Sequence, residues 1–201
     1  MTTPERRFNS GTVALRDAGT AGSTGRTVRG YAAVFNKRSE NLGTPSAPWV
    51  EVIAPGAFDG VLKGDVRALF NHDSNLILAR SKNGAGTLKL WVDATGLGYE
   101  FEAPDTQAGR DLLVSLKRGD ISQSSFGFTV ATGGDEWRDE GKTRVRTIRK
   151  IGSLLDVSPV AYPAYPDATA AARAAGQAGA PADGFKLNPA DAALAARFGI
   201  F

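Results

Sequence analysis

The residues with the most evident chemical potential are a single histidine, His72, and an adjacent serine pair, Ser124 and Ser125, in the strand-like run 121–130. A serine hydroxyl is a weak nucleophile until a base removes its proton, and an imidazole, with a pKa of about 6.5, suits that task at neutral pH. Because the chain has no second histidine, only His72 could be that base.

The alternation of side chains along a strand separates the two serines. Ser124, Phe126 and Phe128 point to one face, while Ser125 and Gly127 point to the other. The face with two phenylalanines is expected to be the core face, so Ser124 is buried there. Ser125 is then expected on the open side, where the missing side chain of Gly127 makes room for an extended substrate. Ser125 is therefore the candidate nucleophile.

A carboxylate that could orient the imidazole lies in the run 154–158. If Leu155 and Val157 point inward, Asp156 points outward together with Ser158. A carboxylate beside a histidine fixes the imidazole tautomer and supports its positive charge. Asp156 is thus the candidate third member of a Ser-His-Asp triad.

Spacing alone leaves other interpretations open. A histidine at the end of a strand is usually structural, and an outward aspartate is usually just solvated. The face of His72 is also open, because alternation aligns it with Phe70 unless the strand ends at Asn71. A metal hydrolase has little support, since one histidine and no cysteine leave only oxygen ligands. We expect neither a metal nor an organic cofactor.

The elements that must position these residues are mostly short strands. Period-two runs separated by turn signals such as Asn83-Gly84 predict a mainly antiparallel sheet. The predicted strands are 27–35, 49–53, 66–71, 76–81, 86–92, 97–102, 121–130, 137–138, 143–150 and 152–158. One helix is predicted over 105–119, ending at Gly119, and a shorter one over 55–63.

Length and composition indicate one globular domain with tails. The 201 residues are expected to form a flexible arm (1–26), a β-barrel domain (27–167) and an Ala/Gly/Pro-rich tail (168–201) with a short helix near 189–198. The absence of cysteine favours a cytosolic setting. A net charge of +3, with both signs interspersed, does not predict nucleic-acid binding. The polar N-terminus and the lack of a long apolar run predict neither export nor a membrane span.

Several blocks of the sequence resemble one protein family. Residues 121–128 and 154–165 look like the signature of the tailed-phage prohead maturation proteases. Residues 30–35, 51–58 and 69–73 resemble further blocks of that family in the same order, so the resemblance covers roughly residues 28–168. It implies a mainly β fold of the herpesvirus-assemblin type, a closed antiparallel β-barrel flanked by helices.

The resemblance also implies roles for the candidate residues. It carries His72 over as general base and Ser125 as nucleophile, whereas Asp156 stands where the family more often has glutamate. Oxyanion donors could be backbone amides near Gly127 or an arginine of the strand 144–149.

The implied function is that of a serine endopeptidase of phage capsid maturation. Such a protease acts inside the assembling prohead in the host cytoplasm, cleaves scaffold protein or a scaffold-like segment of the major capsid protein, and usually cleaves itself. The assemblin likeness suggests a homodimer, although the sequence identifies no dimer surface. The alternative is a noncatalytic, capsid-associated β-barrel that keeps the fold without the activity.

Overall fold

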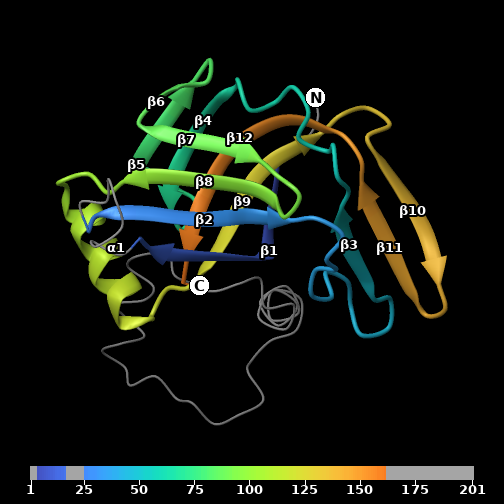
Figure 1. The fold of residues 1–201 in the computed structure, drawn as a ribbon. Helices are drawn as coiled ribbons and strands as arrows, with labels where there is room; N and C mark the ends of the chain where they lie inside the picture. The colour runs from blue at the N-terminus through green and yellow to red at the C-terminus, as the bar shows by residue number, and fades with distance from the viewer. Residues whose placement is uncertain (1–3, 17–24, 162–201) are drawn as a thin grey trace, which may run out of the picture. The chain divides into compact units, whose positions relative to one another are not determined.

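The structure, a computed structural model, describes residues 4–16 and 25–161 of the chain (Figure 1). Within these ranges lie twelve strands and one helix. In chain order they are β1 Glu5–Leu15, β2 Thr27–Val34, β3 Trp49–Ile53, β4 Asp65–Phe70, β5 Asp73–Lys82, β6 Ala85–Gly86, β7 Leu88–Val92, β8 Gly96–Glu102, α1 Gln107–Arg118, β9 Gln123–Val130, β10 Asp135–Glu140, β11 Thr143–Ile148 and β12 Ile151–Val160.

Nine strands form one strongly curved sheet. Their order is β6-β5-β4-β12-β9-β1-β2-β8-β7, and β7 comes back into contact with β5 and β6 at the other end of this order. The sheet is therefore a nearly closed barrel, which confirms the predicted mainly β architecture. The candidate serine strand β9 and the candidate aspartate strand β12 are neighbours near the middle of the sheet.

Parallel strand pairs interrupt the predicted antiparallel pattern in two places. In the barrel, β12 runs parallel to β4, with Asp156 opposite Arg67. In the separate three-stranded sheet β10-β11-β3, the strand β3 pairs in parallel with β11. Parallel neighbours need long connections, and both pairs join segments far apart in the chain. The pairing of β4 with β12 brings the His72 hairpin beside β12.

Aromatic and aliphatic side chains fill the barrel interior. Phe126 and Phe128 are fully buried and stack at a centroid distance of 4.8 Å, and Phe58 packs edge-on against Phe126. Tyr99 of β8 and Val157 of β12 are also fully buried. Burying large rings supplies much of the hydrophobic stabilisation of a barrel of this size. The predicted core face of β9 is therefore the inner face of the barrel.

The predicted helix forms at α1, and its ends follow from the sequence. The Thr106 side chain caps the first turn by accepting a hydrogen bond from the backbone amide of Gly109 at 3.2 Å. Gly119, at φ 81°, ends the helix in the left-handed conformation, which glycine adopts without a steric cost. The shorter helix predicted over 55–63 is wrong. That segment is a series of tight turns, with Gly56 and Gly60 at positive φ.

The predicted N-terminal arm requires a correction. Residues Glu5–Leu15 form the strand β1, which pairs with β9 on one side and with β2 on the other (Figure 1). Neighbouring strands thus order a polar segment whose own pattern does not predict a strand. The tail and short helix predicted for 168–201 lie outside the described residues. Within residues 4–16 and 25–161, no helix has the length and apolar character that a membrane crossing needs.

Candidate active site

His72 lies in the tight turn that joins β4 to β5. The two turn residues, Asn71 and His72, have φ values of 53° and 59°, the pattern of a two-residue type I′ hairpin. The Asn71 amide donates to the carbonyl of Pro159 at 3.1 Å, and its side-chain oxygen accepts the amide of Ala161 at 2.9 Å. These bonds fix the turn against the end of β12. Because β4 ends at Phe70, strand alternation does not determine where the imidazole points.

The two serines of β9 lie on opposite faces, as strand alternation predicts. Ser124 shares the inner face with the phenylalanines, and its hydroxyl lies 2.7 Å from the Tyr99 hydroxyl. Ser125 contacts His72 on the other face. Across the antiparallel ladder, Ser125 is the partner of Ser158.

Asp156 reaches the same face through an irregularity in β12. The register with β9 shifts between Leu154 and Asp156, so that Leu154 and Val157, rather than the predicted Leu155 and Val157, enter the core. A β-bulge re-aims the side chains around it and is common beside functional sites. The aspartate still projects to the face that carries Ser158, as predicted.

The structure brings the three predicted residues into one hydrogen-bonded chain. The His72 Nε2 atom lies 2.6 Å from the Ser125 hydroxyl, and Nδ1 lies 2.6 Å from Asp156 Oδ1. An ionised carboxylate only accepts hydrogen bonds, so Nδ1–H donates to Asp156 and Nε2 is left to accept the serine proton. This arrangement suits a nucleophile, a base and an orienting carboxylate.

The burial of the site differs from the expected open face. Ser125 is 0% exposed, and His72 and Asp156 are 5% and 6% exposed. The space left by the missing side chain of Gly127 is not open for substrate, although the sequence predicted that it would be. A Cβ at Gly127 would lie 2.3 Å from Asp156 Oδ2, so the missing side chain makes room for the carboxylate. The outer face of β9 is therefore filled by the site's own residues.

Ser158 is a fourth polar residue of the site, and sequence analysis gave it no role. It is fully buried, and its hydroxyl donates to Asp156 Oδ1 at 2.7 Å. Its Oγ atom also lies 3.3 Å from His72 Nδ1. The Asp-x-Ser spacing was the available signal, because residues two apart on a strand share a face.

The arginines of residues 144–149, one of the two sequence-based options for oxyanion donors, form ion pairs with other residues. Arg144 pairs with Asp139 and Arg149 pairs with Glu136. Opposite Ser125, the ladder between β1 and β9 is interrupted between Arg7 and Gly11. The irregular backbone beside the serine thus belongs to the N-terminal strand.

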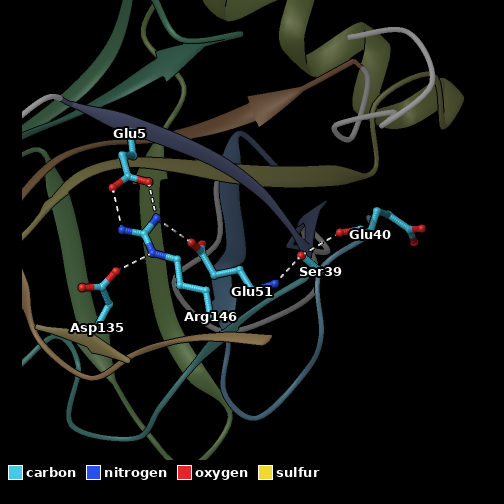
Figure 2. Close-up of polar contacts among 6 residues, drawn as sticks. All are labelled: Glu5, Ser39, Glu40, Glu51, Asp135 and Arg146. Atoms are coloured by element: carbon cyan, nitrogen blue, oxygen red, sulfur yellow. Dashed lines mark hydrogen bonds and ion pairs between the residues drawn. The ribbon is translucent and has the colours of Figure 1, made fainter. Parts of the chain in front are cut away.

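Arg146, the third of these arginines, is surrounded by three carboxylates (Figure 2). It donates to both oxygens of Glu5, at 2.6 and 3.0 Å, to Asp135 at 2.7 Å and to Glu51 at 3.2 Å. Burial alone would lower the pKa of Arg146, but its hydrogen bonds to Glu5 and Asp135 and the charge of Glu51 outweigh it and raise that pKa. This group, which we call the Arg146 cluster, joins β1 of the barrel to the three-stranded sheet.

Comparison with known proteins gives one family match. Residues 12–180 match the family model described as caudovirus prohead serine protease. The matched range covers most of the chain and contains His72, Ser125 and Asp156. No curated protein and no solved structure shows a significant match.

Proposed function

The chain belongs to the caudovirus prohead serine protease family, and on this premise we propose that Ser125, His72 and Asp156 are its catalytic nucleophile, general base and orienting carboxylate. Membership supports the role of a serine protease in phage maturation, with action in the prohead within the host cell. The observation that carries the residue assignment is the position of His72, whose two ring nitrogens lie 2.6 Å from Ser125 and from Asp156.

In the proposed reaction, the Ser125 oxygen attacks the carbonyl carbon of the scissile peptide bond while His72 Nε2 takes the hydroxyl proton. Asp156 supports the positive charge that forms on the imidazole. The tetrahedral intermediate collapses when His72 returns this proton to the leaving amine, which breaks the C–N bond. A water molecule, deprotonated by the same nitrogen, then releases the acyl group and restores Ser125.

The proposed substrates are the scaffold protein or a scaffold-like segment of the major capsid protein, together with the chain itself. Cleavage of a peptide bond in the prohead is irreversible, so it can drive assembly in one direction without a nucleotide. The resemblance to assemblins implies a homodimer, and we include this in the proposal.

The test is co-expression of Ser125→Ala with the cognate capsid and scaffold proteins. We expect processing to fall by at least about 10³-fold, because removing a triad nucleophile removes the covalent pathway. Ser122→Ala is the matched control, since Ser122 is an exposed serine three residues away. Processed capsid or scaffold in the presence of Ser125→Ala would contradict the assignment.

One observation favours the second candidate, a noncatalytic capsid-associated barrel. Ser125 is 0% exposed, whereas an attacking oxygen must come within about 3–3.5 Å of a substrate carbon. The same co-expression separates the candidates. A noncatalytic barrel leaves scaffold and capsid uncut by the wild-type chain as well as by the variant.

A further inference from the structure

We propose that Ser158 is a positioning residue of this site, whose hydroxyl holds the Asp156 carboxylate in the orientation that aligns His72. This inference rests on the proposed function, because it assigns a role within the same site. The two neighbours of the hydroxyl are Asp156 Oδ1 at 2.7 Å and His72 Nδ1 at 3.3 Å. Ser158 is 0% exposed, so protein groups rather than bulk solvent must satisfy its hydrogen bonds.

The direction of each hydrogen bond follows from donor and acceptor chemistry. The Asp156 Oδ1 atom accepts the Nδ1–H of His72 at 2.6 Å, and the same oxygen accepts the Ser158 hydroxyl. A carboxylate oxygen can accept two such bonds, whereas Nδ1–H cannot accept a bond from Ser158. The serine proton is therefore directed to the carboxylate. It shares the negative charge with the imidazole and limits rotation of the carboxyl group.

The other carboxylate oxygen is fixed by shape. Asp156 Oδ2 occupies the space that a Cβ at Gly127 would fill. Asp156 Oδ2 thus packs against Gly127, and Asp156 Oδ1 accepts hydrogen bonds from His72 and Ser158. A buried carboxylate needs such partners, because the interior does not replace lost hydration.

The backbone of Ser158 is held from the barrel interior. Its carbonyl accepts the Ser124 hydroxyl at 3.3 Å, and Ser124 lies 2.7 Å from the hydroxyl of Tyr99. Since the Ser124 proton points to the carbonyl, Tyr99 is the donor to Ser124. Complete burial raises the pKa of Tyr99, which keeps this donor protonated. Ser158 is therefore fixed through its backbone by Ser124 and Tyr99, and its side chain in turn positions Asp156.

The sharpest test compares two variants of nearly equal shape, Ser158→Thr and Ser158→Val. Threonine keeps the hydroxyl, and valine replaces it with a methyl group. We expect the Thr variant to cleave the cognate scaffold protein within about threefold of the wild-type kcat. The Val variant is expected to lose about 10- to 100-fold in kcat with little change in KM, which is the usual range for losing a hydrogen bond to a charged group.

A second readout does not require substrate. His72 is the only histidine, so its imidazole signals in a nitrogen-15 NMR titration need no assignment among competitors. Removing the Ser158 donor leaves more negative charge on Asp156 Oδ1, which favours the imidazolium. The midpoint of the imidazole titration is therefore expected at higher pH in the Val variant than in the Thr variant.

Two controls separate positioning from general destabilisation. Ser153→Ala removes an exposed serine of the same strand and is expected to change neither readout. Tyr99→Phe removes only the remote hydroxyl, so a small loss in kcat without a shift of the imidazole midpoint is expected.

Equal kcat values and equal imidazole midpoints in the Thr and Val variants would overturn the proposal. A loss of kcat in the Val variant with an unmoved midpoint would also overturn it, because this pattern indicates a merely structural role. If both variants fail to fold, Ser158→Ala replaces them in the same two measurements, against the wild type. Cleavage that persists in Ser125→Ala, by contrast, contradicts the proposed function and not the role of Ser158 alone.

Discussion

At the scale of single residues, the site depends on a close fit between Gly127 and Asp156. These residues are partners across the β9–β12 ladder, and a Cβ at position 127 would lie 2.3 Å from Asp156 Oδ2. That separation is far inside van der Waals contact, so one of the two groups must move. The aspartate side chain moves more readily than two paired strands.

Gly127→Ala is therefore expected to displace the carboxylate while the barrel stays folded. Its φ is not in the left-handed region, so alanine meets no backbone strain there. We expect kcat for scaffold cleavage to fall by about 10- to 100-fold, since misplacing a catalytic group by about 1 Å has effects of this size. Gly152→Ala, at the exposed start of β12, is the control. Unchanged cleavage by a folded Gly127→Ala protein would mean that Asp156 does not orient His72.

At the scale of elements, the β4–β5 hairpin is the part that presents His72. Its turn uses two residues with positive φ, Asn71 and His72, which belong to the non-glycine types that adopt this conformation most often. The bonds of Asn71 to Pro159 and Ala161 stabilise the turn. At the other end of the hairpin, Asp65 makes a two-point ion pair with Arg80, at 2.7 and 2.6 Å.

This ion pair gives the hairpin a defined pH dependence. The hydrogen bond from Arg80 lowers the pKa of Asp65 from 3.8 to about 2. A carboxyl group whose folded-state pKa is lowered adds stability that is complete above about pH 4 and is lost as the pH falls toward 2.

We expect Asp65→Asn to lower the urea midpoint slightly at pH 7, because the pair is exposed to solvent. The difference from wild type is expected to shrink as the pH falls below about 4 and to vanish below pH 2. Asp59→Asn, an exposed aspartate of the turn segment, is the control. A difference that stays constant down to pH 2 would show that charge pairing is not its cause.

The elements also show what the sequence could and could not predict. Strands with clear alternation, such as Trp49–Ile53, and the helix with its terminal Gly119 match closely, because local pattern and capping determine them. Strand β1 was missed because its stability comes from pairing with β9 and β2, which are remote in sequence.

Within the candidate site, strand alternation was enough to predict that Ser124 and Ser125 lie on opposite faces of β9. It could not predict the bulge before Asp156, the turn at His72 or the burial of Ser125, because each depends on contacts between distant strands.

At the scale of the whole molecule, the Arg146 cluster joins the two sheets. Arg146 is 12% exposed, and Glu51 beside it is 3% exposed, so solvent screens their interaction only weakly. Removing the arginine would leave Glu5, Glu51 and Asp135 close together without their shared cation. Like charges in a partly buried site repel, and each carboxylate loses the hydrogen bonds that Arg146 donates to it.

Arg146→Met is therefore expected to lower the free energy of unfolding by about 3 kcal/mol, as measured by urea denaturation. Arg138→Met is the matched control on the neighbouring strand. Its side chain is 74% exposed and lies 4.0 Å from Glu136, so a change within about 0.5 kcal/mol is expected. Equal effects of the two substitutions would show that the cluster does not hold the sheets together.

The burial of the proposed nucleophile leads to a prediction about access to the site. Since Ser125 is 0% exposed, a substrate carbonyl can reach its oxygen only after the molecule opens locally. A fluorophosphonate, which forms an O–P bond to an activated serine and expels fluoride, reports on such opening. We expect slow labelling of the isolated protein, and labelling at least tenfold faster in the presence of assembling capsid and scaffold proteins. A tenfold change corresponds to about 1.4 kcal/mol of opening free energy supplied by binding.

Mass spectrometry of the labelled protein identifies the modified residue, and Ser125→Ala is the control for labelling elsewhere. Labelling that is equally fast with and without the partner proteins would mean that the buried arrangement imposes no barrier. If the faster labelling is lost in Ser125→Ala but kept in Ser122→Ala, then assembly with the partner proteins increases the accessibility of Ser125. Proteolysis would then begin only where its substrates are gathered, because the assembling shell itself supplies the free energy that exposes the nucleophile.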